Sequence, residues 1–215
     1  MFINIHTHHP RNNEEWSILS LHANFETIHS LSYYSTGIHP CYIEAYTIEE
    51  EMNKMKISST ANNVLAIGEC GLDRICGVDF KLQEKVFIEQ ILWANEIAKP
   101  LIIHCVRAHR EIIQLLKEHN RIAPVIFHGF NNNIDIANDI VSQGYYLSFG
   151  KSLFNPHEEN VFAAVSNEKI FLETDDSELP IDAVFKQAAK IKNTSAEQLN
   201  NQIQKNVQKV FNLSL

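Results

Sequence analysis

The sequence predicts an α/β fold of the TIM type, a trimmed (β/α)8 barrel, in a single domain that spans residues 1–215. Eight apolar runs have the length of strands and are rich in β-branched or aromatic residues. From Val64 onward these runs alternate with amphipathic stretches, which indicates a parallel sheet. Residues able to bind metal ions stand at or just past the ends of several runs, where a barrel gathers its functional side chains.

The predicted strands share short length and high apolar content, and several are almost continuously apolar, as strands buried on both faces should be. They cover residues 2–6, 16–22, 31–37, 64–69, 101–104, 124–128, 145–149 and 170–173.

Amphipathic stretches follow the later strands and predict helices over residues 83–98, 108–119, 134–142, 158–165 and 195–211. Ser195 and Gln198 have the spacing of an N-terminal capping box. The first third differs, because only residues 9–15 and 23–30 separate its three predicted strands, whereas a parallel crossover takes about a dozen residues. Either the first helices are short or missing, or the strand assignment is wrong there.

The composition, with 45% hydrophobic and 20% charged residues, is typical of a soluble globular protein. A formal net charge of -8 argues against a strongly basic nucleic-acid surface, although bound divalent cations would still allow the site to hold a phosphate. The four cysteines form no C-x-x-C pair, and no signal peptide or membrane span is visible. We therefore expect a cytoplasmic protein with no membrane association and no stable protein partner.

Six candidate metal ligands end or follow apolar runs: His6, His8, Glu69, His104, His128 and Asp175. His6 and His8 are two residues apart, so both imidazoles lie on one face of a strand and can reach one ion. A carboxylate such as Glu69 at the end of a buried strand needs a partner, either a cation or an arginine. A lone histidine is more often a hydrogen-bonded core residue, and Asp175 could instead begin a helix. Their recurrence at equivalent positions favours a metal site.

Six short motifs occur in order over almost the whole chain, and together they resemble the TatD family of metal-dependent hydrolases, within the amidohydrolase-like barrels. The matching segments are Asn4-Ile5-His6-Thr7-His8, Gly37-Ile38-His39-Pro40, Gly68-Glu69-Cys70-Gly71-Leu72-Asp73, Pro100-Leu101-Ile102-Ile103-His104-Cys105-Val106-Arg107, His128-Gly129-Phe130 and Glu173-Thr174-Asp175. Several motifs in order are far more specific than any one of them.

The resemblance implies a role for each candidate ligand. His6 and His8 match the ligands of a first metal, and His104 and His128 match those of a second. Glu69 matches a carboxylate that bridges two metals, and Asp175 matches the ligand that positions the attacking water, so these two are the expected catalytic residues. Members of the family are Mg²⁺-dependent or similar divalent-metal nucleases acting on DNA, which makes nucleic acid the expected substrate.

The metal itself is less well defined, and we expect one or two divalent ions among Mg²⁺, Mn²⁺, Zn²⁺, Ni²⁺ and Co²⁺. Four imidazoles and two carboxylates favour the transition metals by affinity, whereas Mg²⁺ prefers oxygen ligands.

Three further polar residues near strand ends are candidates for substrate binding or support. Arg107 is expected to contact a phosphate, with a solvated surface position as the alternative. His39 is expected to contact substrate or to support a ligand, although a histidine before a proline is also an ordinary loop feature. Asp73 is expected to orient a loop or a ligand, or to act only as a cap.

Departures from the family pattern keep two other functions open. Asn4 stands where the family commonly has an aspartate, and the chain lacks both a helical segment between the first two strands and a basic loop after Asp175. The trimmed loops and acidic charge allow an amidohydrolase-like enzyme for a small lactone, amide or phosphoester. A non-catalytic metal-binding barrel is the third hypothesis, and retention of Asp175 argues against it.

Overall fold

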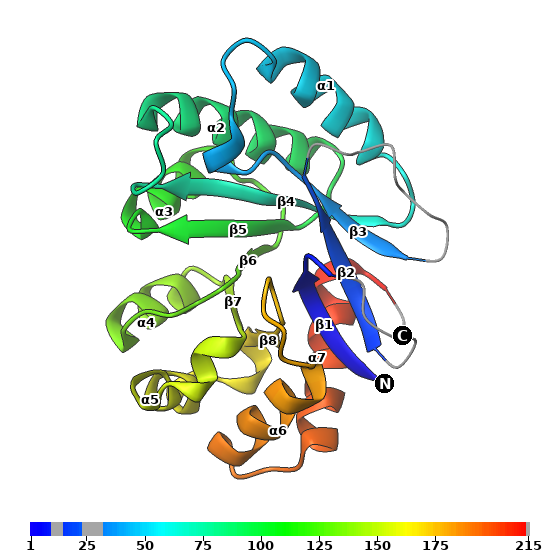
Figure 1. The fold of residues 1–215 in the computed structure, drawn as a ribbon, viewed down its shortest axis with the longest axis vertical. Coiled ribbons are helices and arrows are strands. Elements are labelled where there is room, and N and C mark those ends of the chain that lie inside the picture. The colour runs from blue at the N-terminus through cyan, green and yellow to red at the C-terminus, as the bar shows by residue number, and fades with distance from the viewer. Residues whose placement is uncertain (10–14, 23–31, 214–215) are drawn as a thin grey trace. The chain divides into compact units, whose positions relative to one another are not determined.

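The computed structural model describes residues 1–9, 15–22 and 32–213, and this part of the chain contains eight β-strands ordered β1 to β8 (Figure 1). They are β1 (Phe2–Thr7), β2 (Glu15–Leu21), β3 (Tyr33–Thr36), β4 (Val64–Asp73), β5 (Leu101–Val106), β6 (Val125–Phe127), β7 (Tyr146–Phe149) and β8 (Ile170–Leu172). The predicted strands are thus confirmed, although β4 and β5 run beyond their predicted ends. Strand pairs with a defined register are parallel, as predicted for a (β/α)8 barrel.

The chain forms two compact units, each described here by itself. The terminal unit contains Met1–Leu19 and Phe127–Leu215, and the central unit contains Ser20–Ile126. The prediction of a single domain over residues 1–215 stays a prediction.

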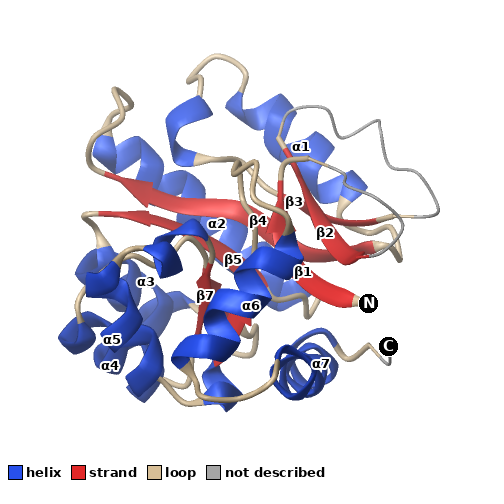
Figure 2. Cartoon of the chain, turned by 60° about the horizontal axis from the view of Figure 1, so that its bottom comes forward, coloured by secondary structure: helices blue, strands red, loops and turns tan. Residues whose placement is uncertain are grey.

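In the terminal unit, three helices pack on strands β1, β7 and β8, and a fourth, residues 156–164, packs on two of those helices. Helices are blue and strands red in Figure 2. These four helices are α4 (Ile134–Ser142), α5 (Pro156–Ala164), α6 (Ile181–Ile191) and α7 (Ala196–Phe211). Phe2 of β1 stacks on Phe185 of α6 with ring centroids 4.5 Å apart. Helix α7 begins at the predicted capping box, in which the Ser195 hydroxyl accepts from the Gln198 N–H at 3.1 Å. Burial of these apolar faces at roughly 25 cal/mol per Å² holds the helices against the strands.

In the central unit, β4 pairs with β3 and β5, and all ten of its residues are buried. The helices of this unit are α1 (Ile48–Ser58), α2 (Phe80–Glu96) and α3 (His109–His119). Helix α2 covers β4 with an apolar stripe that includes Phe87, Ile91 and Ala94, all fully buried. Its first turn is capped by Asp79, whose side chain accepts from the Leu82 N–H at 3.0 Å.

The five predicted helices are confirmed with ends shifted by up to three residues, and the structure adds α1 and α6. Most of residues 9–15 and 23–30, where short or missing helices were expected, lie outside the described residues, so that expectation stays a prediction. Residue 31 of the third predicted strand also lies outside them. No helix in the described part of the chain combines the length and hydropathy needed to cross a membrane.

The first and last strands meet in the terminal unit, as the closure of a barrel requires. Thr7 and Asp175 form a parallel bridge, in which the Asp175 N–H donates to the His6 carbonyl at 3.0 Å and the His8 N–H donates to the Asp175 carbonyl at 3.2 Å. The two segments thereby fix each other's backbone at the positions of the predicted ligands His6, His8 and Asp175.

Buried side-chain hydrogen bonds reinforce this junction. The Asn4 amide donates to Thr174 Oγ1 at 2.9 Å and accepts from the Thr174 N–H at 3.0 Å. Thr174 Oγ1 then donates to Thr7 Oγ1 at 3.0 Å. The three side chains are fully buried, so each hydroxyl or amide needs these partners. Asn4 therefore connects β1 to the residue before Asp175.

Replacing Thr174 by Val is expected to lower the free energy of unfolding by about 1–3 kcal/mol, because the Asn4 amide and the Thr7 hydroxyl lose a buried partner. Thr174→Ser keeps the hydroxyl and is expected to retain more of that stability. Urea unfolding followed by circular dichroism measures both. Thr60→Val is the matched control, since Thr60 is exposed, and should change stability by less than about 0.5 kcal/mol. Equal stability of the Thr174→Val variant and the unmodified chain would contradict the proposed role of this network.

Candidate metal centre

Three predicted ligands meet in the terminal unit and form what we call the β1–β8 cluster: His6, His8 and Asp175. His6 lies within β1, His8 directly follows it, and Asp175 follows β8. Because alternate residues of a strand share a face, His6 and His8 point to one side and Thr7 to the other. His6 Nε2 lies 3.5 Å and His8 Nε2 lies 3.3 Å from Asp175 Oδ1.

The geometry of the β1–β8 cluster fits a metal ion. One nitrogen or oxygen atom from each side chain lies within 4.8 Å of the others. Around an ion with bonds of 2.0–2.1 Å, tetrahedral ligand atoms are roughly 3.3 Å apart, close to the two measured separations. Imidazole and carboxylate are also the donors that first-row divalent ions use in proteins.

His128, a fourth predicted ligand, lies beside this cluster. It follows β6, and its ring centroid is 4.2 Å from that of His6. Its Nδ1 is 3.6 Å from Oε1 of Glu173, a buried carboxylate in the terminal unit. A carboxylate next to a ligand histidine fixes the orientation of the ring.

The Asp175 carboxylate is held in its ionised form. Burial alone would raise the pKa of Asp175, but the hydrogen bonds from His6 and His8 and the positive charge of His128 outweigh it and hold the pKa far below its ordinary value. The residue also has a positive φ of 53°, a conformation that aspartate adopts more readily than most residues. Asp175 is therefore a charged acceptor at neutral pH.

A polar cavity of about 490 Å³ adjoins Asp175 in the terminal unit. Small, amide and charged residues line it: Gly129, Asn131, Gly150, Lys151, Ser152, Asn155, Glu158, Glu173 and Asp175. The volume suits a small molecule or one nucleotide unit. Among these lining residues, Lys151 is the one lysine or arginine. The Lys151 Nζ lies 2.7 Å from Asp176 Oδ1.

Glu173 ends a predicted strand and opens the Glu173-Thr174-Asp175 motif, but it was not among the predicted site residues. Its carboxylate is fully buried, and Oε1 accepts from the Gly129 N–H at 2.6 Å. Glu173 thus holds the backbone next to His128 and lines the cavity. A buried acidic residue inside a predicted strand was the available signal, because an isolated charge is costly to bury.

The other predicted ligands, Glu69 and His104, meet in the central unit and with Asp73 form what we call the His104 cluster. His104 Nδ1 lies 2.9 Å from Glu69 Oε1, and His104 Nε2 lies 2.8 Å from Asp73 Oδ2. Ligand atoms at right angles around an ion with 2.1 Å bonds are roughly 3.0 Å apart, so the Glu69–His104 pair also fits an ion.

Asp73 acts both as a cap and as a partner of a ligand. Its Oδ1 accepts from the Ile75 and Cys76 N–H groups at 2.8 and 3.1 Å, while Oδ2 faces His104. Burial would raise the pKa of Asp73, but the hydrogen bond with His104 and those from the two backbone N–H groups lower it. An ionised Asp73 orients the His104 ring through the nitrogen that faces away from Glu69.

Close backbone packing positions Glu69 and His104. A Cβ atom at Gly68 would lie 2.5 Å from the Ile102 carbonyl oxygen, and one at Gly71 would lie 2.0 Å from that of His104. Only glycine fits at these distances, which accounts for the glycines on both sides of Glu69. The backbones of β4 and β5 therefore set the position of both ligands.

Two more histidines approach the Glu69 carboxylate. His39 Nε2 lies 3.4 Å from Glu69 Oε1, and His22 Nε2 lies 3.8 Å from Glu69 Oε2. The predicted supporting role of His39 agrees with this contact, and its substrate role stays a prediction. His22 ends a predicted strand but was not among the predicted site residues. Arg107 is exposed after β5, so its phosphate contact also stays a prediction.

The structure thus brings four predicted ligands together in the terminal unit and two in the central unit. Convergence of all six on one centre rests on the sequence resemblance and remains a prediction.

Comparisons with known proteins agree with the predicted fold and family. The family described as TatD related DNase matches residues 7–212. A protein of *Buchnera aphidicola* named an uncharacterized metal-dependent hydrolase is 33% identical over 199 residues, which cover 83% of this chain and 74% of that protein. The deoxyribonuclease Tat-D of *Schizosaccharomyces pombe* is 29% identical over 178 residues, covering 76% of this chain and 55% of that protein.

Among solved structures, YjjV of *Escherichia coli*, a TatD homologue, superposes with a TM-score of 0.84 at 22% identity, covering 99% of this chain and 98% of that one. A TatD family hydrolase from *Entamoeba histolytica* superposes with a TM-score of 0.80 at 16% identity, covering 98% and 97%. These likenesses confirm the predicted barrel fold. The family match over residues 7–212 and the 33% identity to the Buchnera protein show that the chain belongs to the TatD-related DNase family.

Proposed function

We propose that this chain is a metal-dependent phosphodiesterase of nucleic acid, and specifically a deoxyribonuclease. The observation that carries the proposal is the β1–β8 cluster, in which two imidazoles and an ionised carboxylate lie at ligand distances beside a polar cavity. The *S. pombe* relative named a deoxyribonuclease supports the choice of substrate. The chain's net charge of -8 makes bound cations the natural source of attraction for a phosphate.

The residues proposed to hold one or two divalent ions are the predicted ligands His6, His8, Glu69, His104, His128 and Asp175. The identity of the ion stays open among Mg²⁺, Mn²⁺, Zn²⁺, Ni²⁺ and Co²⁺. A bound ion of this kind lowers the pKa of a water and polarises a phosphoryl oxygen.

Asp175 is proposed to orient the attacking water. Its carboxylate accepts a hydrogen bond from the water and takes the proton as the water oxygen bonds to phosphorus. The bond from phosphorus to the leaving sugar oxygen breaks, and that oxygen takes a proton from solvent. His6 and His8 keep Asp175 in place, since both imidazoles face the same carboxylate oxygen.

The cavity beside Asp175 is proposed to receive the substrate. Lys151 carries the positive charge that can contact a phosphate oxygen, and Asn131 and Asn155 offer amide groups for a sugar or a base. Glu158 and Glu173 disfavour any additional negative charge in the same space. The cavity therefore suits one phosphodiester unit better than a highly charged polyphosphate.

Removing metal from the purified chain with a chelator is expected to abolish release of nucleotides from single- and double-stranded DNA. Adding back each of the five candidate ions in turn should restore it with at least one of them, and nucleotide release followed over time measures the result. No release under any ion would contradict the nuclease proposal. Turnover of small lactones, amides or phosphoesters in parallel assays would favour an amidohydrolase-like activity instead.

The variant Asp175→Asn is expected to lower kcat by about 10²–10⁴-fold, because an amide of the same size cannot accept the proton of the water. Metal content measured on the same preparation separates loss of the ion from loss of chemistry. Unchanged kcat with metal retained would show that Asp175 is not the proton acceptor.

Replacing Lys151 by Ala is expected to raise KM for DNA about tenfold, equivalent to about 1.4 kcal/mol, with little change in kcat. Lys186→Ala is the matched control, because Lys186 is exposed and pairs with Asp182 at 2.7 Å, as Lys151 pairs with Asp176. Steady-state kinetics at fixed salt measures both variants. Equal KM values for the two would remove Lys151 from the proposed substrate site.

A further inference from the structure

Two cysteines and Asp73 form a second group of potential ligands in the central unit, which we call the thiol cluster: Cys41, Asp73 and Cys76. Cys41 lies in the 3₁₀ helix Pro40–Tyr42, and Cys76 lies in the loop after β4. Cys41 Sγ is 3.5 Å from Asp73 Oδ2, and Cys76 Sγ is 3.6 Å from the Asp73 carbonyl oxygen. Neither cysteine belongs to the predicted ligands of the hydrolytic centre.

The spacing of the thiol cluster fits a tetrahedral site with sulfur ligands. Both sulfur atoms and a carboxylate oxygen of Asp73 lie within 4.8 Å of one another. With metal–sulfur bonds of 2.3 Å, ligand atoms of a tetrahedral site are roughly 3.7 Å apart. The measured 3.5 Å between Cys41 Sγ and Asp73 Oδ2 is close to this value, so an ion needs only small side-chain movements.

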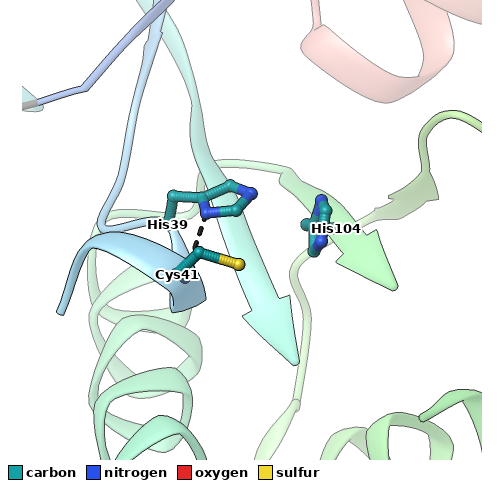
Figure 3. Close-up of side chains that lie close together, drawn as sticks. All are labelled: His39, Cys41 and His104. Carbon is teal, nitrogen blue, oxygen red and sulfur yellow. Dashed lines mark hydrogen bonds between the residues drawn. The ribbon is translucent and has the colours of Figure 1, made fainter. Parts of the chain in front are cut away.

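Imidazoles border the cluster and offer a fourth ligand. One ring nitrogen of His39 and one ring nitrogen of His104 each lie within 4.8 Å of Cys41 Sγ. The two nitrogens also lie within 4.8 Å of each other. Figure 3 shows the Cys41 side chain beside the His39 ring, with His104 on the neighbouring strand. The Cys41 N–H donates to His39 Nδ1 at 3.1 Å, so His39 Nε2 carries the ring proton and faces Glu69, which makes His104 the imidazole that can bind an ion.

Surrounding hydrogen bonds hold the thiol cluster in place. Asp73 Oδ1 accepts from the Cys76 N–H, and the Gln83 amide donates to the Asp73 carbonyl at 3.0 Å and contacts Cys76 Sγ at 3.5 Å. Gln83 is itself 1% exposed. Cys41 and Cys76 are only partly buried, so an ion can reach sulfur atoms that are already close together. Such prior organisation reduces the entropy lost on binding.

We propose that Cys41, Cys76 and Asp73, with His104, form a binding site for a thiophilic cation such as Zn²⁺ or Cd²⁺. Thiolate ligands select such ions, whereas the imidazoles and carboxylates of the β1–β8 cluster lack sulfur. The two sulfur ligands of the proposed site take no part in the proposed nuclease activity, although the site shares Asp73 and His104 with the His104 cluster. A cation bound at the thiol cluster also affects His104, a predicted ligand of the hydrolytic centre. Asp73 Oδ2 must then give up its contact with His104 Nε2 or share it with the cation.

Titration with Cd²⁺ tests this proposal on the full chain, stripped of metal and reduced with a phosphine. Cadmium bound to thiolates gives an ultraviolet charge-transfer band, which imidazole and carboxylate ligands do not give. The unmodified chain is expected to develop this band up to one equivalent of Cd²⁺. The variants Cys41→Ser and Cys76→Ser are each expected to lose most of it, with circular dichroism confirming that each variant is folded.

Two controls make the outcome specific. Cys105→Ser removes a cysteine outside the thiol cluster and should keep the band, and Asp175→Asn should keep it even where DNA hydrolysis is lost. The proposal is overturned by absence of the band in the unmodified chain, or by its persistence in the folded Cys41→Ser/Cys76→Ser double variant. Loss of the band in Cys105→Ser would equally place the bound ion elsewhere.

Discussion

The parallel contact between the end of β1 and the residues after β8 is the constraint on which the β1–β8 cluster depends. Two backbone hydrogen bonds, from Asp175 to His6 and from His8 to Asp175, place the carboxylate against both imidazoles. The buried network of Asn4, Thr174 and Thr7 keeps the two segments in register. Since residues of a strand alternate, a shift by one position would turn His6 and His8 away from Asp175. The chemistry of this cluster is thus fixed by strand pairing.

A carboxylate that faces more than one histidine is the common feature of both candidate ligand groups. Asp175 faces His6 and His8 in the terminal unit, and Glu69 faces His104, His39 and His22 in the central unit. A second carboxylate then supports a ligand histidine, Glu173 beside His128 and Asp73 beside His104. These outer carboxylates set the orientation of the rings, and a fixed orientation raises the affinity of an imidazole for a metal. Four of the chain's carboxylates, those of Glu69, Asp73, Glu173 and Asp175, therefore lie where cations are expected to bind.

Much of this arrangement could be predicted from the sequence, because apolar runs and the residues at their ends carry the information. The strands and the ligand motifs follow from hydrophobic pattern, whereas α1 was missed because only Met52 and Met55 of its residues are buried. Helix α6 was also missed, although Ile181, Val184, Phe185 and Ala188 have helical spacing. Glu173, His22 and the contact between Cys41 and Asp73 depend on neighbours that are distant along the chain. Residue pattern alone does not specify such pairs.

The β1–β8 cluster joins residues that are distant along the chain. Thr7 and Thr174, whose hydroxyl groups are hydrogen-bonded beside the cluster, are 167 positions apart. During synthesis, His6 and His8 leave the ribosome long before Asp175 has been added. A nascent chain therefore lacks the carboxylate of this cluster until β8 and the residues that follow it have been added, and any product truncated before β8 lacks it permanently.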